Sequence, residues 1–275
     1  MFWFQHSVSS PKAASHRGVA IKYIDLMSAQ DNFILELKTT AVDWVYSQEK
    51  YKTIIDQELA KRGGKYINAQ NYILQMADQK FRKGCPQGQF GELLLFNFIQ
   101  HFFKSPPLLR KMSITTNAAL ERHGADAIHY LRKDESHCFL LGESKCYESK
   151  YKFNTALEKS VESIFTSFDK IFSELNLYHL DDFIHPELQE IASELKRGII
   201  KNARFELVCM IVYEETSDIA DANEQLIKNK IEQCILERWK TAPSTLYSTR
   251  NQFAVERINY IVFPVWGLNK LLQDF

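Results

Sequence analysis

The chain has no excess of charge of either sign. It carries 34 basic and 34 acidic residues in 275, so its formal net charge is zero. No global field therefore favours binding to nucleic acid or to a membrane surface. A polyanion would have to be bound by local basic clusters or delivered by a partner.

Cysteines are few, and their spacing gives no sign of a disulfide framework. The five cysteines are scattered and include no CxxC pair: Cys85, Cys138, Cys146, Cys209 and Cys234. A reducing compartment fits this pattern best. A zinc site built from Cys138 and Cys146 fails on distance, because eight residues along one strand span about 26 Å.

Long hydrophobic runs are also missing. No uninterrupted apolar stretch approaches the roughly 20 residues needed to cross a bilayer, and the start "MFWFQHSVSS" has no basic segment typical of a signal peptide. The phosphate-binding pattern GxxxxGK[ST] is absent too, so the chain shows no sign of binding ATP. We therefore expect a soluble cytoplasmic protein.

What the chain does contain is typical of a globular protein. Hydrophobic residues make up 45%, aromatic residues 13% and charged residues 25%. At this length we expect one core with substantial helical additions. We divide the chain into a mainly helical N-terminal extension, residues 1–84, and a core, residues 85–275, with a helical insertion at about 176–203.

The hydrophobic pattern predicts the order of the elements. Residues 1–30 indicate an irregular start, with one candidate strand near "GVAIKYIDL". Apolar spacings of three and four predict helices within 31–83, then at 91–103, 152–175 and 222–239. Strand-like runs begin at residues 111, 124 and 137, and two more cover 205–213 and 258–265. This order predicts an α/β fold, a mixed sheet with helices on both faces.

The stretch "FLLGESK", residues 139–145, ends an apolar strand with charged residues. Glu143 and Lys145 share a face with Phe139 and Leu141 because side chains two apart in a strand point the same way. If the preceding hairpin turns between residues 134 and 135, paired residue numbers add up to 269. Asp126 then lies opposite Glu143.

Two opposed carboxylates are destabilising unless another charge offsets them. Oxygen ligands suit Mg²⁺, which takes one or two protein carboxylates and completes its shell with water and phosphate; Mn²⁺ can substitute. We therefore expect Asp126 and Glu143 to bind the metal. Lys145 would orient or deprotonate the attacking water, or stabilise charge on the phosphate.

Glu92 is a third candidate metal ligand. It lies in the first turn of the 91–103 helix, on the same stripe as Phe96, Ile99 and Phe103. If that helix covers the apolar face of the sheet, Glu92 can reach the metal directly or through water. The alternative is that Glu92 only complements the helix dipole.

Together these residues resemble the PD-(D/E)xK nucleases, which have a restriction-endonuclease-like core. Ala125 stands where that motif begins with proline. More narrowly, "GELLLFNFI", "RHGADAIHY" and "LLGESK" resemble the HamA family, the nuclease subunits of the Hachiman anti-phage defence system. The resemblance covers about residues 85–265. It implies Glu92, Asp126, Glu143 and Lys145 as active-site residues.

The resemblance also implies a partner, a HamB-like helicase of superfamily 2 type that uses ATP. A nuclease of zero net charge would bind DNA weakly alone, because non-specific affinity comes from phosphate neutralisation. Candidate DNA contacts are Arg122 and His123 before Asp126, and Lys150 and Lys152 after the motif. Further basic residues lie beside the first strand: Lys104, Arg110 and Lys111.

Two other functions stay open. The chain could be a non-catalytic nucleic-acid-binding or helicase-regulating module on the same fold, whose acids are structural. It could also be a stand-alone restriction or repair nuclease that cuts without a helicase. His129 is expected to be a core histidine, since it faces away from Asp126.

Overall fold

A computed structural model describes residues 1–8, 11, 15–81, 87–109, 124–178 and 188–275. The strand predicted from residue 111 and the candidate contacts at 110, 111, 122 and 123 lie outside these ranges. No helix among the described residues combines the length and apolar character needed to span a bilayer.

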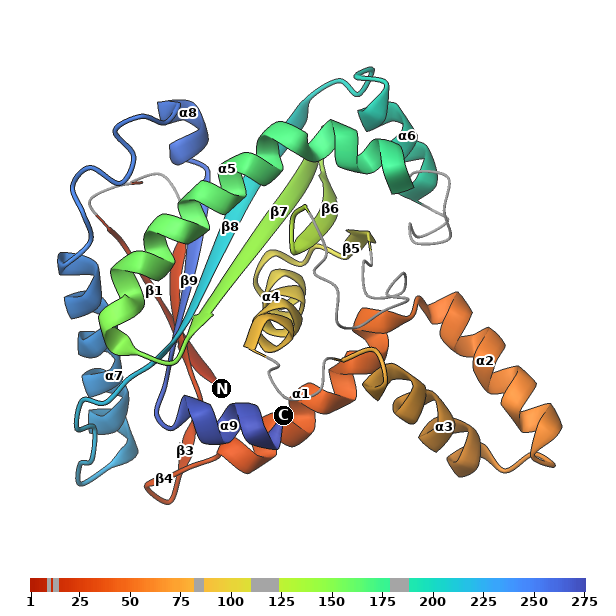
Figure 1. Cartoon of the computed structure of the whole chain (residues 1–275), viewed down its shortest axis with the longest axis horizontal. Coiled ribbons are helices and arrows are strands. Elements are labelled where there is room, and N and C mark those ends of the chain that lie inside the picture. Colours follow the sequence, from red (N-terminus) through yellow and green to blue (C-terminus); the bar gives the residue numbers. More distant parts are fainter. Residues whose placement is uncertain (9–10, 12–14, 82–86, 110–123, 179–187) are drawn as a thin grey trace.

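The described strands form a mixed seven-stranded sheet in the order β1-β2-β9-β8-β7-β6-β5 (Figure 1). The strands are β1 (Phe2–His6), β2 (His16–Ala20), β5 (Pro107–Leu109), β6 (Ala127–Lys133), β7 (Ser136–Tyr147), β8 (Ala203–Glu214) and β9 (Ile258–Val265). The inner strands β2, β9, β8 and β7 run parallel, and the outer pairs β1–β2, β7–β6 and β6–β5 are antiparallel. A separate small ribbon pairs β3 (Tyr23–Ile24) with β4 (Met27–Ser28).

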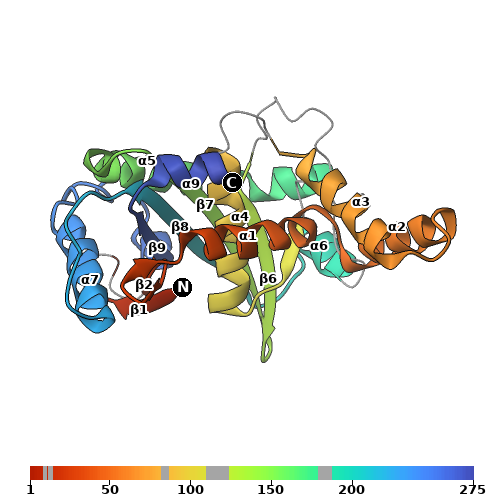
Figure 2. The same ribbon diagram turned by 90° about the horizontal axis from the view of Figure 1, so that it is seen from below.

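Helices cover both faces of the sheet. One core contains residues of α1 (Gln30–Val45), α2 (Gln48–Lys61), α3 (Tyr66–Asp78), α4 (Gln87–Phe103) and α9 (Leu268–Asp274). The other contains residues of α5 (Phe153–Tyr178), α6 (Gln189–Lys196), α7 (Glu224–Lys240) and α8 (Gln252–Val255). Figures 1 and 2 both show α2 and α3 extending away from the sheet as a helical arm.

The sheet follows from its buried strands and their crossovers. Parallel strands need a long connection, here α5 between β7 and β8 and α7 between β8 and β9. Along β7, Phe139 and Leu141 face the core with α5, whereas Leu140 faces the core with α4. The predicted α/β class, with a mixed sheet between two helical layers, is confirmed.

The N-terminal prediction was wrong for β1 and right in part for β2, which overlaps the candidate strand near "GVAIKYIDL" at residues 18–20. Instead of an irregular start, β1 and β2 complete one side of the central sheet, and Arg17 and Gly18 pair with Ile261 and Val262 of β9. The sheet therefore draws strands from both sides of the predicted boundary at residue 84. β5 and α9 were also absent from the sequence prediction.

Two glycines let α4 lie close to β7. A Cβ at Gly142 would come within 2.8 Å of Leu95 and 3.0 Å of Ile99 of α4. From the helix side, a Cβ at Gly91 would come within 2.8 Å of the Ser144 hydroxyl oxygen. These contacts place α4 against the face of β7 that carries Gly142 and Ser144.

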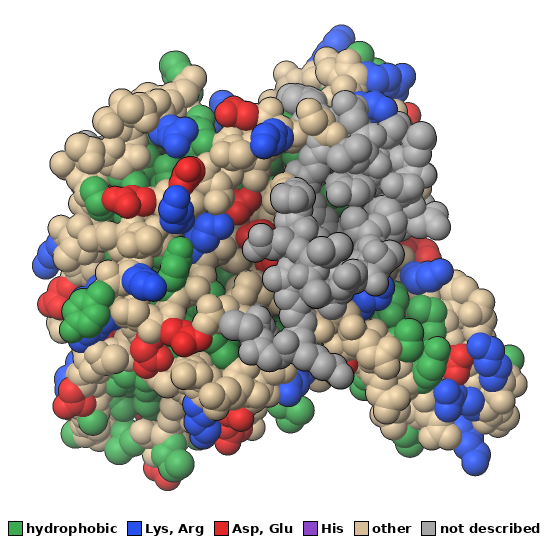
Figure 3. All heavy atoms as spheres, in the orientation of Figure 1, with side chains coloured by type: hydrophobic (Ala, Val, Ile, Leu, Met, Phe, Trp, Pro, Cys, Tyr) green, Lys and Arg blue, Asp and Glu red, His purple; other side chains and the backbone are tan. Residues whose placement is uncertain are grey.

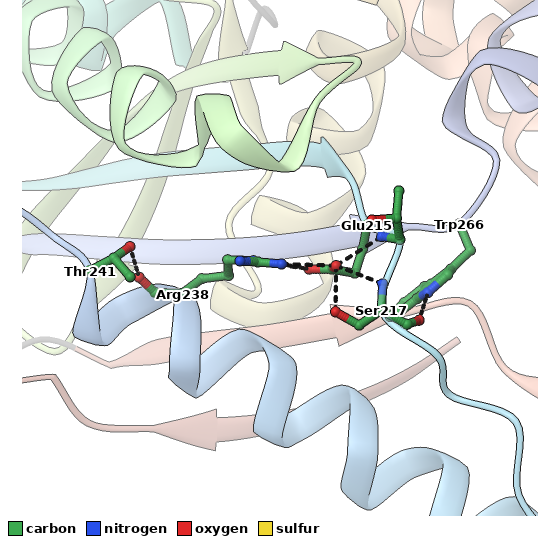
Figure 4. Close-up of polar contacts among 6 residues, drawn as sticks. Glu215, Ser217, Arg238, Thr241 and Trp266 are labelled. Carbon is green, nitrogen blue, oxygen red and sulfur yellow. Dashed lines mark hydrogen bonds and ion pairs between the residues drawn. The ribbon is translucent and has the colours of Figure 1, made fainter.

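A buried ion pair joins the end of β8 to α7 (Figure 4). Arg238 donates hydrogen bonds of 2.9–3.0 Å to both carboxylate oxygens of Glu215, whose side chain is 0% exposed. Burial acts to raise the pKa of Glu215. The bonds donated by Ser217 and Thr216, together with Arg238, outweigh burial and hold the pKa below its usual range.

We expect Arg238→Met to lower the free energy of unfolding at pH 7 by about 3 kcal/mol, since it leaves Glu215 buried without its cation. The pKa of Glu215 is lowered from its ordinary value of 4.5 in the folded state. The ionised Glu215 therefore stabilises the fold fully above pH 4.5, and this stabilisation is lost as the pH falls through the lowered pKa. The deficit should shrink towards pH 3. Urea unfolding at a series of pH values measures it.

Arg204→Met is the matched control. Arg204 pairs with Glu206 at the start of β8, where its side chain is 62% exposed. An exposed pair contributes about 1 kcal/mol or less. Equal losses in the two variants would contradict a special role for the Glu215 pair.

Candidate active site

The β6–β7 hairpin has the register that the sequence predicted. Ala127 pairs with Gly142, Ile128 with Leu141 and Leu131 with Cys138, so paired numbers add up to 269. Asp126 immediately precedes β6. Its carboxylate oxygen Oδ2 accepts the backbone N–H of Ser144 at 2.8 Å, just beyond the last paired residues.

Glu143 lies under α5. It is only 4% exposed, and its oxygen Oε1 accepts a hydrogen bond of 2.7 Å from the Ser167 hydroxyl of α5. Its other oxygen, Oε2, lies 3.5 Å from the Lys145 ammonium. The Lys145 side chain is 24% exposed, so it links the buried carboxylate to solvent.

Burial and a neighbouring carboxylate make it costly to ionise Glu143. Burial contributes most, and the charge of Asp126 adds to it, so that the pKa of Glu143 is raised to about 8. Burial acts to lower the pKa of Lys145, but Glu143 and Asp126 outweigh it and raise that pKa. The three groups therefore act on one another electrostatically.

These groups fit a divalent cation. Burial first, and the charge of Asp126 second, raise the pKa of Glu143, and when both carboxylates are ionised Lys145 supplies only one positive charge against two negative charges. Carboxylate oxygens are the ligands that Mg²⁺ prefers. Asp126 and Glu143 are thus the described residues suited to hold a metal at this end of the ladder.

Glu92 does not join them in the way the sequence suggested. The premise that its helix covers the face of Glu143 was wrong, because α4 packs on the Gly142 and Ser144 face of β7. Within the described ranges, no three His, Cys, Asp or Glu side chains are grouped closely enough to hold a metal. A role for Glu92 as a third ligand stays a prediction.

The position of Glu92 along α4 nevertheless points to the same end of the sheet. Glu92 lies one helical turn before Phe96, whose ring centre is 5.6 Å from that of His129 on β6. The stripe on α4 therefore runs towards the start of β6, where Asp126 lies. Glu92 approaches that end from the opposite side of the sheet.

Sequence reasoning missed Ser167. This serine lies among apolar residues of α5, three after Ile164 and four before Ile171, and it is buried. Ser160, seven residues earlier, is buried on the same side of the helix. A serine at a core-facing position of an otherwise apolar stripe was the available signal, since buried hydroxyls need partners.

The remaining candidates have different surroundings. Lys150 and Lys152 lie in the short 3₁₀ turn η2 (Lys150–Lys152) that follows β7. His129 is buried, and its Nδ1 forms a 2.8 Å hydrogen bond with the carbonyl of Ser105. The expectation of a core histidine is confirmed.

Comparison with known proteins identifies one family. The family model described as HamA matches residues 2–275, nearly the whole chain. No curated protein matches the chain in sequence.

We expect Glu143→Gln to raise the melting temperature of the metal-free protein at pH 9 by about 5 °C. The folded state raises the pKa of Glu143 from 4.5 to about 8, so stability falls as the pH rises through that window. Glutamine is neutral throughout and keeps an oxygen for Ser167. Calorimetry with EDTA at pH 5 and pH 9 measures the difference.

Glu158→Gln, an exposed change on α5, provides the control and should have the melting temperature of the wild type at each of the two pH values. If Glu143→Gln lowered the melting temperature at pH 9, the Glu143 carboxylate would already be compensated. The electrostatic case for a bound cation would then be lost.

Proposed function

The chain belongs to the HamA family, and on that premise we propose that it is a metal-dependent nuclease that hydrolyses DNA phosphodiester bonds in anti-phage defence. The observation that carries the proposal is the placement of Asp126, Glu143 and Lys145 at the end of the β6–β7 ladder, where Asp126 accepts the N–H of Ser144 and Lys145 lies 3.5 Å from Glu143. Two carboxylates and a lysine in this arrangement suit a phosphate bound through a divalent cation.

The carboxylates would hold the metal. Asp126 immediately precedes β6 and Glu143 lies in the neighbouring strand β7, and the bond from the Ser144 N–H fixes the orientation of Asp126. The bond from Ser167 does the same for Glu143. Mg²⁺, or Mn²⁺ in its place, would supply Lewis-acid stabilisation of the phosphate charge.

Lys145 has the exposure and charge needed to act on the substrate. Its raised pKa keeps it protonated at neutral pH, which favours stabilising charge on the phosphate or orienting water over removing a proton. The Oε2 oxygen of Glu143 lies 3.5 Å from the Lys145 ammonium and orients it. Glu92 would assist through water from the α4 side.

A partner would supply what the neutral chain lacks. With 34 basic and 34 acidic residues, the protein has little general attraction for DNA. We propose that a HamB-like helicase, driven by ATP, presents DNA to the site. The Lys150 and Lys152 turn next to β7 is a candidate DNA contact.

The rival function, a non-catalytic module, gains no support from the register. It would be favoured if Asp126 and Glu143 pointed to opposite faces of the sheet. Instead the charge of Asp126 adds to burial, the larger cause, in raising the pKa of Glu143.

We expect the purified chain with a HamB-like helicase, ATP and Mg²⁺ to cut linear DNA, and Glu143→Ala or Lys145→Ala to slow cutting at least about 100-fold. Gel electrophoresis of labelled DNA measures the rate. Omitting the helicase tests the stand-alone nuclease, which would cut at an undiminished rate.

Glu158→Ala and Lys170→Ala are the matched controls, because both residues are exposed on α5 and carry the same charges. They should cut as the wild type does. Cutting by Glu143→Ala at the control rate would contradict the proposed active site.

Ser167→Ala should reduce kcat about 10-fold with little change in KM, because Ser167 positions the Glu143 carboxylate and does not contact DNA. Ser160→Ala is the control. Ser160 is also buried on the same helix, but its hydroxyl donates a 2.8 Å hydrogen bond to the backbone carbonyl of Leu157. Similar losses in both variants would indicate a packing effect only.

A further inference from the structure

The row of side chains that begins at Glu143 continues to the surface. Because side chains alternate along a strand, Glu143, Lys145 and Tyr147 project from the same face of β7. Tyr147 packs half-buried against the α5 core, whereas Cys146 packs against the other core. Tyr147 lies four positions after Glu143 along the strand, a distance of about 13 Å.

The turn after β7 places lysines over tyrosine rings. The Lys152 ammonium lies 5.9 Å from the centre of the Tyr147 ring. The Lys150 ammonium lies 5.5 Å from the centre of the Tyr151 ring. Both are within the range of cation–π attraction, so η2 presents two Lys–Tyr pairs beside the end of the strand.

Tyr151 stands out from the other aromatic residues near the site. Its side chain is 86% exposed, and it sits between two lysines. Within the described part of the chain, neither Lys150 nor Lys152 forms an ion pair with a carboxylate. The ammonium groups can therefore pair with phosphates without breaking an existing salt bridge.

The surrounding charges are mixed. Glu148 of the same turn bonds to Gln87, and Lys159 on α5 pairs with Glu162 at 2.7 Å. Figure 3 shows basic and acidic side chains interspersed on the face along which α5 lies. Electrostatic attraction alone would bind nucleic acid weakly at this surface. The exposed Tyr151 ring is therefore the feature that points to nucleic-acid binding here.

We propose that the Lys150–Tyr151–Lys152 turn is a binding platform for single-stranded nucleic acid, with a base stacked on Tyr151 and the lysines on adjacent phosphates. The proposal rests on the proposed function in that it names the form of nucleic acid that reaches the site. Base faces are available in a single strand but are covered by neighbouring bases in a duplex.

The spacing gives the platform a position along the strand. At the 3.4 Å spacing of a stacked strand, the 13 Å from Glu143 to Tyr147 corresponds to about four nucleotides. Tyr151 lies in the turn that follows Tyr147, so a base stacked on it would be held apart from the phosphate at Glu143 and Lys145. A frayed end or a strand released by a helicase could thread across this distance, whereas an intact duplex offers Tyr151 no base face.

Binding without cleavage tests the platform. The chain is titrated in EDTA and 50 mM salt against a fluorescein-labelled 12-nucleotide oligo(dT) and against a 12-base-pair DNA hairpin closed by a non-nucleotide linker, and anisotropy gives each Kd. We expect Tyr151→Ala to weaken oligo(dT) binding about 5- to 100-fold. Hairpin binding should change less than about twofold, and Tyr151→Phe should restore oligo(dT) binding because it keeps the ring.

The lysines have a different signature. Replacing Lys150 and Lys152 together by alanine should weaken the binding of both oligo(dT) and the hairpin. It should also reduce the slope of log Kd against log salt for oligo(dT) by about 1.4. Phe253→Ala is the matched control, since Phe253 is 80% exposed on α8 but lies outside the turn. It should leave both dissociation constants unchanged.

Three results would overturn the platform: no measurable oligo(dT) binding by the wild type, hairpin binding as tight as oligo(dT) binding, or equal behaviour of Tyr151→Ala and Phe253→Ala. None of these requires DNA cleavage. A loss of cutting in Glu143→Ala with an unchanged oligo(dT) Kd would support both proposals. If oligo(dT) binding depended on Tyr151 but no metal-dependent cutting were found, the proposal of a single-strand-binding platform would stand and the proposal of a nuclease would be rejected.

Discussion

Between β6 and β7, the pairing of Ala127 with Gly142 is the last of the ladder, and the Asp126 carboxylate continues it by accepting the N–H of Ser144. This bond fixes the acid that starts β6 against the acid in the middle of β7. Because strand side chains alternate with a period of two, a shift of one residue would send Glu143 and Lys145 to the α4 core. Every chemical property of the site, including the coupling between the two acids, depends on this register.

The environment of the site disfavours the ionised form of Glu143. Ser167 and Lys145 contact the two oxygens of Glu143, yet burial and Asp126 still raise its pKa to about 8. Elsewhere the protein pairs a buried acid fully, as with Glu215 and Arg238, and there the pKa falls. The contrast separates a carboxylate that stabilises the fold from one that lacks a full counter-charge, and such perturbed groups are characteristic of functional sites.

The hairpin could be predicted from sequence because its register is local. A two-residue loop at Asp134 and Glu135 joins the strands, and Asp134 adopts the left-handed conformation at φ 54° that aspartate tolerates. The face covered by α4 could not be predicted in this way, because it depends on the close approach of Gly91 to Ser144 and of Gly142 to Leu95, residues that are 53 and 47 positions apart. Likewise, β2 pairs with β9 across more than 240 residues, and a short strand of mixed pattern carries no local signal for that partner.

The two ends of β7 have different physical tasks. Towards its start, Phe139 and Leu141 are fully buried and bind the strand into the core. Towards its end, β6 has stopped, and the strand carries Glu143, Lys145 and Tyr147 from the interior to the surface. Over these residues β7 stays paired with β8, which holds the strand in place, while the Lys145 side chain remains 24% exposed. That combination allows the same element to position a buried carboxylate and to lead into the exposed turn at Tyr151.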